Sequence, residues 1–174
     1  MGEEPWLRGP LAGVHSLLAP TLYAFAQARE DLVQWTEGLT DDEIWLQPHG
    51  VASVGFQLRH IAGSVERLTT YLRGEQLTPQ QLAAIPREME PGAGRLTLLE
   101  EINEALHQSE QVIRALDPTI LSDSRSVGRK GLPTTVIGLV VHLAEHTQRH
   151  VGELIVTTKL ARSTQAGRTR PKPS

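Results

Sequence analysis

The stretch LVVHLAEHTQRHVGEL, residues 139–154, holds three of the chain's seven histidines at intervals of four residues. Leucine and valine residues fall on broadly the same side at helical spacing, so the stretch predicts a helix whose imidazoles point toward an apolar interior. A buried imidazole costs free energy unless a partner satisfies it, and a metal ion is one such partner. The stretch therefore predicts a packed helical fold and half of a metal site.

Helix geometry leaves two ways to form that half-site. Residues four apart lie about 6 Å apart along the axis, which suits two imidazoles on one ion with bonds near ~2.1 Å. His142 and His150 are separated by about 12 Å along the axis, so the pair is either His142 with His146 or His146 with His150. A pair of this kind also arises by chance on a solvated helix. His60, between two apolar residues of an earlier helix, is the candidate for a third ligand.

Helical periodicity dominates the rest of the chain. Four long helices are expected, over residues 11–38, 51–73, 97–116 and 136–161. The first is interrupted at Pro20, so it either kinks there or starts afresh at Thr21. The third is expected to begin with a capping box at Thr97, and a short connector helix with a capping box at Thr78.

These elements predict an all-α protein. Four amphipathic helices bury their apolar stripes most simply in a four-helix bundle, and the long connection over residues 75–96 permits a crossover between the second and third helices. Residues 118–133 are rich in Ser, Gly, Arg and Pro and are expected to form a loop, with no convincing strand pair. We expect one domain over residues 1–161 and a basic, disordered tail over 162–174.

Composition excludes several classes of function. The chain of 174 residues has a net charge of −3 and no cysteine. The absence of a basic field argues against nucleic acid as a partner, and no apolar run approaches the ~20 residues that span a bilayer. Without cysteine there are no disulfides, thiolate ligands or cysteine nucleophile. We therefore expect a cytoplasmic protein that does not bind membranes or nucleic acid.

Two segments together resemble the DinB-like family of four-helix-bundle metalloproteins. They are LTDDEIWLQPHGVASVGFQLRHIAG (residues 39–63) and HLAEHTQRHVGEL (residues 142–154), and the resemblance extends over about residues 10–161. It implies a DinB-like bundle with three metal ligands, His60, His146 and His150, because Gly152 follows the second histidine pair as in the family. His142 then falls outside the ligand set and lies beside it.

The resemblance also implies a class of chemistry. Three neutral imidazoles leave a divalent ion with its full charge and an open position, and we expect one ion per chain, zinc or nickel. The family includes thiol S-transferases, so the expected function is a metal-dependent enzyme that joins a small-molecule thiol to an electrophile. The alternatives are a metal-binding or stress-response bundle without chemistry and a helical interaction module with merely buried histidines. A homodimer is plausible for such a bundle.

Residues near the expected ligands are candidates for supporting roles. Gln57 and Ser64 lie one turn on either side of His60, and Glu153 follows His150, so all three could hydrogen-bond a ligand or a bound molecule. His49 could line the mouth of a cavity. Arg129 and Lys130, between glycines in an expected loop, could meet an anionic cosubstrate; no catalytic residue is assigned.

Overall fold

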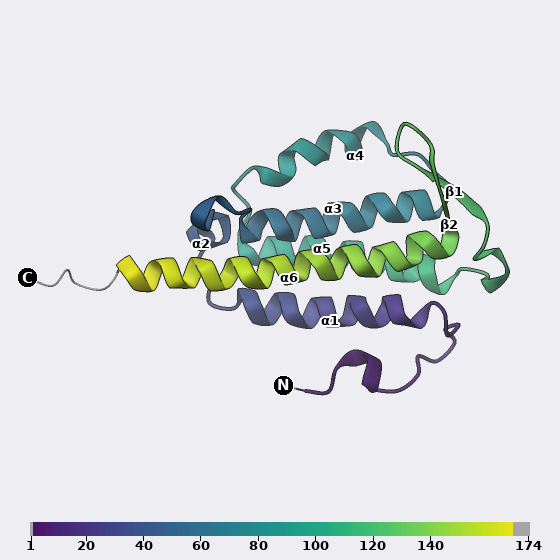
Figure 1. The fold of residues 1–174 in the computed structure, drawn as a ribbon, viewed down its shortest axis with the longest axis horizontal. Coiled ribbons are helices and arrows are strands. Elements are labelled where there is room, and N and C mark those ends of the chain that lie inside the picture. The colour runs from purple at the N-terminus through teal and green to yellow at the C-terminus, as the bar shows by residue number, and fades with distance from the viewer. Residues whose placement is uncertain (1, 169–174) are drawn as a thin grey trace, which may run out of the picture.

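Four long helices run side by side in the computed structural model, which describes residues 2–168 (Figure 1). They are α1 (Ala19–Thr36), α3 (Val54–Leu72), α5 (Arg95–Arg114) and α6 (Val136–Arg168). Two short helices, α2 (Asp41–Trp45) and α4 (Pro79–Ala84), and four 3-10 turns lie between or before them: η1 (Pro5–Leu7), η2 (Pro48–Gly50), η3 (Ile85–Met89) and η4 (Pro118–Ile120). The predicted four-helix bundle is therefore confirmed.

The helices do not follow a simple up-and-down order. The segment with α4 and η3 runs back along the bundle, so that α5 starts at the same end as α3 and runs parallel to it (Figure 1). On α6, Val140 accepts a hydrogen bond from Thr21 and Gln148 donates one to Ala24, so α6 is parallel to α1. The crossover that the long connection permits is present.

Local sequence signals set most helix starts. The side chain of Ser53 caps α3 by accepting from the Phe56 amide, and the predicted capping box at Thr78 begins α4. Helix α1 starts at Ala19, which places Pro20 in the first turn, where a proline is tolerated. The prediction of a capping box at Thr97 was wrong, because α5 begins two residues earlier at Arg95.

A β-hairpin replaces most of the loop expected over residues 118–133. Strand β1 (Ser124–Val127) pairs antiparallel with β2 (Leu132–Thr135). The turn between them uses Gly128 and Gly131, whose φ values of 72° and 59° lie in the left-handed region that glycine adopts without steric cost. The expectation of no strand pair was therefore wrong.

Helix α6 continues beyond its expected end at residue 161. Ala161 is fully buried, and the Arg162 side chain donates to the backbone carbonyl of Glu37, so this part of α6 packs on the end of α1. Residues 169–174 of the expected tail lie outside the described residues. Among residues 2–168, none of the helices combines the length and the apolar character that a membrane span requires.

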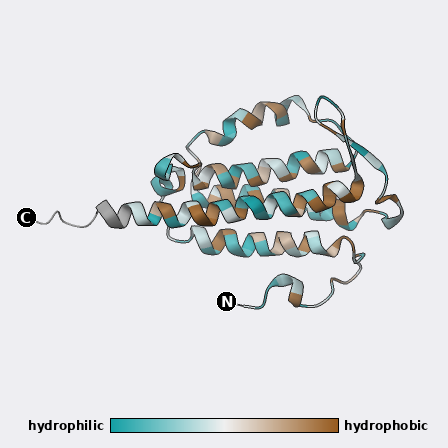
Figure 2. Cartoon of the chain, viewed as in Figure 1, coloured by the Kyte–Doolittle hydropathy of each residue, from teal (hydrophilic) through white to brown (hydrophobic). Residues whose placement is uncertain are grey.

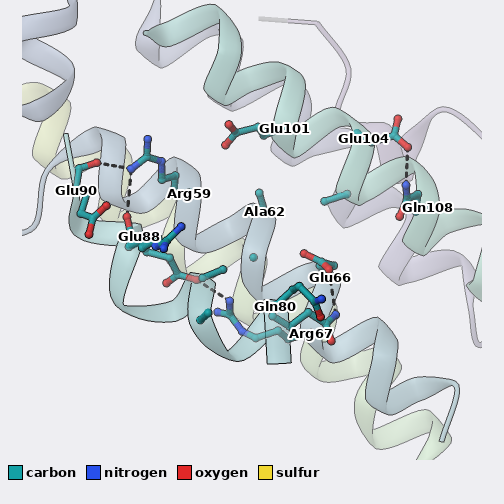
Figure 3. Close-up of a pocket in the computed structure, with 16 residues that line it drawn as sticks. Arg59, Ala62, Glu66, Arg67, Gln80, Glu88, Glu90, Glu101, Glu104 and Gln108 are labelled. Atoms are coloured by element: carbon teal, nitrogen blue, oxygen red, sulfur yellow. Dashed lines mark hydrogen bonds and ion pairs between the residues drawn. The ribbon is translucent and has the colours of Figure 1, made fainter. Parts of the chain in front are cut away.

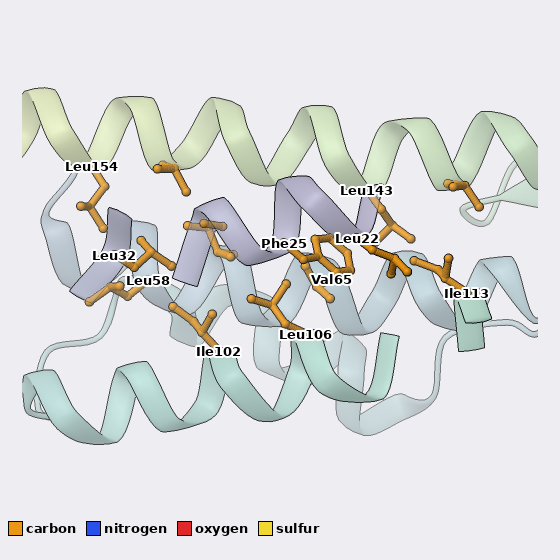
Figure 4. Packing of buried hydrophobic residues seen from close by; sticks show 14 of the residues in the cluster. Leu22, Phe25, Leu32, Leu58, Val65, Ile102, Leu106, Ile113, Leu143 and Leu154 are labelled. Carbon is orange, nitrogen blue, oxygen red and sulfur yellow. The ribbon is translucent and has the colours of Figure 1, made fainter. Parts of the chain in front are cut away.

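The core fills the space between the long helices. Hydrophobic residues are spaced along each of them, and their side chains meet inside the bundle (Figures 2 and 4). The buried residues drawn there include Leu22, Phe25, Leu32, Leu58, Val65, Ile102, Leu106, Ile113, Leu143 and Leu154. Leu58 and Ile61 of α3 and Leu143 of α6 are fully buried. This packing fixes the rotation of α3 and α6 and brings their histidines to the seam between them.

Candidate metal centre

The three predicted ligands meet in the seam between α3 and α6. His60 comes from α3, and His146 and His150 lie one turn apart on α6. One ligand atom from each histidine lies within 4.8 Å of the others. The Nε2 atoms of His60 and His146 are 3.1 Å apart, close to the separation of about 3.4 Å that two ~2.1 Å bonds to a tetrahedral ion require. The group therefore suits a divalent metal ion.

Glu88 fixes the orientation of the His60 ring. Its Oε2 atom lies 2.7 Å from Nδ1 of His60. Its Oε1 atom lies 2.7 Å from Arg67, and Figure 3 shows this second contact. An ionised carboxylate only accepts hydrogen bonds, so Nδ1 carries the proton and Nε2 keeps its lone pair. A carboxylate behind a histidine in this way is a common support for metal ligation. One face of the His60 ring stacks on Phe56.

Gln57 and Glu153 fix His150 in the tautomer assigned to His60, with the proton on Nδ1. Nδ1 of His150 lies 2.7 Å from Oε1 of Gln57, and the Gln57 amide group donates to Oε2 of Glu153 at 2.9 Å. Because the Gln57 nitrogen faces Glu153, its oxygen faces His150 and accepts the Nδ1 proton. The Nε2 lone pair of His150 is then free for a metal.

Burial keeps His146 and His150 neutral. Burial, with the neighbouring His150, His60 and His142, lowers the pKa of His146 to about 4. Burial also lowers the pKa of His150. Burial would raise the pKa of Glu88, but hydrogen bonds from His60 and Arg67 outweigh it and hold that pKa below its usual value. At neutral pH the site therefore presents two neutral imidazoles from α6, His146 and His150, and a charged Glu88 carboxylate behind His60.

Gly63 makes room for the ion pair between Glu88 and Arg67. A Cβ atom at this position would lie 2.7 Å from both Arg67 Nη1 and Glu88 Oε1. The ion pair therefore lies directly against the backbone of α3, one turn after His60. Nothing in the sequence singles out Glu88, because it lies in the connector that was expected only to break a helix, 28 residues from His60.

The other residues predicted around the ligands are placed less centrally. The His142 ring centroid is 5.3 Å from that of His146, but its Nδ1 atom faces Glu145 at the surface. Ser64 donates to the carbonyl of Ile61 within its own helix. His49 is exposed in η2, with a φ of 53°.

Arg129 and Lys130 lie in the turn of the hairpin, at the end of the bundle where α6 begins. His146 follows the first residue of α6 by ten positions, or about 15 Å along the axis. The contact of Arg129 and Lys130 with an anionic cosubstrate stays a prediction.

The ring nitrogens of the three histidines are suitable ligands for a divalent metal ion. Nδ1 of His60 and of His150 is engaged by an acceptor from the protein, and Nδ1 of His146 is buried with no hydrogen-bond partner among the described residues. Nitrogen ligands of this kind suit zinc, nickel and related divalent ions. His60, His146 and His150 are the residues that would hold the ion.

Comparisons with known proteins identify the family and the fold of the chain. The model of the DinB superfamily matches residues 24–154. A search of curated proteins found no match. Among solved structures, the chain is similar to YfiT from Bacillus subtilis, described as a probable metal-dependent hydrolase with an unusual four-helix bundle topology. That match has a TM-score of 0.65 and 14% identity, and it covers 90% of this chain and 93% of YfiT. Because the family match spans most of the sequence, the chain belongs to the DinB superfamily.

Proposed function

We propose that this protein is a metal-dependent enzyme that transfers a low-molecular-weight thiol to an electrophile. The observation that carries the proposal is the paired orientation of His60 and His150. Each Nδ1 atom faces an acceptor, Glu88 in one case and Gln57 in the other. Both rings therefore present Nε2 to the same space, as metal ligation requires.

Zinc or nickel is the proposed ion, held by His60, His146 and His150. A divalent ion with only neutral ligands keeps its full charge, so it would hold an incoming thiol in its thiolate form at neutral pH. The protein's own residues orient the ligands through Glu88 and Gln57. The packing of Phe56 against His60 keeps water from one face of that ring.

The thiol must come from a cosubstrate, because the chain contains no cysteine. In the proposed reaction the thiol releases its proton to solvent and its sulfur forms a bond to an electrophilic carbon. The leaving group departs from that carbon with the bonding electron pair, so no oxidant or reductant is needed.

A hydrolase is the second candidate. Its support is the description of YfiT as a probable metal-dependent hydrolase, together with a donor set that would also activate water. A bundle that binds metal without catalysing a reaction is the remaining alternative.

One experiment separates the three. Protein loaded with zinc or with nickel is assayed with several small thiols and monochlorobimane, and separately with ester and amide substrates. We expect metal-dependent consumption of thiol that is lost in His60→Ala and retained in His142→Ala. Turnover of esters or amides alone would favour the hydrolase, and stoichiometric metal without turnover in either panel would favour the non-catalytic bundle.

A further inference from the structure

Gly152 lies in the middle of α6 without a packing reason. Glycine in a helix costs about 1 kcal/mol relative to alanine, so a helical glycine usually has a cause. Added Cβ atoms at Gly55, Gly63 and Gly138 would each meet a neighbouring side chain at 2.7 Å. At Gly152 an added Cβ atom would meet nothing within 4 Å. The space beside this residue is open.

That space is a pocket of about 490 Å³ beside α6. Its walls are mainly apolar, and a polar pair stands at one end. The residues that define this Gly152 pocket are Val51, Gly152, Val156 and Leu160, with Gln57 and Glu153 as the polar pair. The hydroxyl of Thr157 donates to the carbonyl of Ala52 at 3.3 Å, which holds the loop before α3 against α6 and keeps the pocket formed.

The Gly152 pocket adjoins the metal centre through the polar pair. Gln57 contacts Nδ1 of His150 and Glu153 lies 3.3 Å from the same atom. The pair therefore lies between the His150 ring and the apolar pocket, so the pocket begins one residue layer away from the ligands along α6. Val156 follows His150 by six residues, or about 9 Å along the helix axis.

We propose that the Gly152 pocket receives the apolar end of the molecule whose reactive end binds at the three-histidine centre. This inference rests on the proposed function and adds the class of substrate: an elongated molecule with a metal-binding head and an alkyl or aryl group about 9 Å away. Apolar surface supports it, because Val156 is 57% exposed and Val51 is 39% exposed at the rim. An apolar ligand group would remove both from water.

The test is a series of hydroxamates bound to the zinc-loaded protein, measured by calorimetry. A hydroxamate binds metal through its head, and its chain can be lengthened from acetohydroxamate to octanohydroxamate. A fully buried methylene contributes about three- to fourfold in affinity. Because the pocket is open on one side, we expect at least about tenfold tighter binding of the octanoyl compound than of the acetyl compound.

Two substitutions fill or charge the pocket and one serves as a matched control. Gly152→Leu places a side chain in the open space, and Val156→Glu places a carboxylate at the rim. Val141→Glu makes the same change on the same helix at an equally exposed valine, 58% exposed, outside the pocket. The measured quantity is the ratio of the octanoyl to the acetyl affinity within each protein, with metal content and helicity recorded.

We expect the ratio to fall close to one in Gly152→Leu and Val156→Glu and to stay at its original value in Val141→Glu. Binding of both compounds with a ratio near one in the unsubstituted protein would overturn the pocket alone. An unchanged ratio in both pocket variants would do the same. If no hydroxamate binds the zinc-loaded protein, the open metal centre itself is wrong and both proposals fail.

Discussion

Replacing Glu88 by glutamine tests whether the connector supports the metal centre. The change keeps an oxygen that can accept the His60 Nδ1 proton but removes the negative charge, which is 2.7 Å from both His60 and Arg67. Loss of a group that hydrogen-bonds a ligating histidine typically costs 10- to 100-fold in metal affinity. Because one acceptor remains, we expect about a tenfold loss, or about 1.4 kcal/mol. For Glu88→Ala, which leaves no acceptor, we expect a loss near 100-fold.

Metal affinity is measured by competition with a chromophoric zinc chelator at fixed pH and salt. Glu90→Gln is the matched control, because it makes the same change two residues away on an exposed side chain. Urea unfolding of the metal-free proteins accompanies the titration, since Arg67, 12% exposed, loses its partner and stability falls by up to ~3 kcal/mol. Affinity of folded Glu88→Gln within twofold of the unsubstituted protein would refute the support role.

Three further results are expected. His146→Ala and His150→Ala each abolish stoichiometric metal after dialysis, whereas His142→Ala keeps the ion; an empty His142→Ala beside a loaded His150→Ala would move the site by one turn. Gly63→Ala weakens zinc binding, because the added methyl displaces the ion pair behind His60, and unchanged affinity in the chelator competition would argue against that contact. The metal-free protein loses stability in urea as pH falls from about 6.5 to about 4: His146 has its pKa lowered to about 4, so the unfolded chain binds more protons in that window. A flat or rising free energy of unfolding there would contradict the buried neutral histidine.

Periodicity and capping residues predict most of the fold because both act within a few residues of chain. The helix start at Thr78 was predicted from a side chain and an amide three positions apart, and the structure has the same contact. The hairpin was missed because its strands are four residues long and mostly polar, with Pro133 in the second. Only the glycines at positions 128 and 131, whose left-handed conformations close the turn, marked it.

The histidines of the candidate site were predictable because their spacing shows on one helix and the resemblance to a family supplied the third. Gln57 and Glu153 were expected near them from helical spacing, and the structure brings both to His150. Glu88 and its partner Arg67 were not expected there. Their closeness to His60 comes from the path of the crossover segment across α3, which no local pattern records.

An ion held between α3 and α6 would also act as a cross-link. His60 and His146 are 86 residues apart in the sequence, so a shared ion closes about half of the chain into a ring. By the chain-entropy relation used for disulfides, closing a ring of that length removes about 4–5 kcal/mol of entropy from the unfolded ensemble. A chain without cysteine has no covalent means to the same end. Metal supply would then determine how long the bundle survives thermal or proteolytic challenge, as the redox state does for a secreted protein held by disulfides.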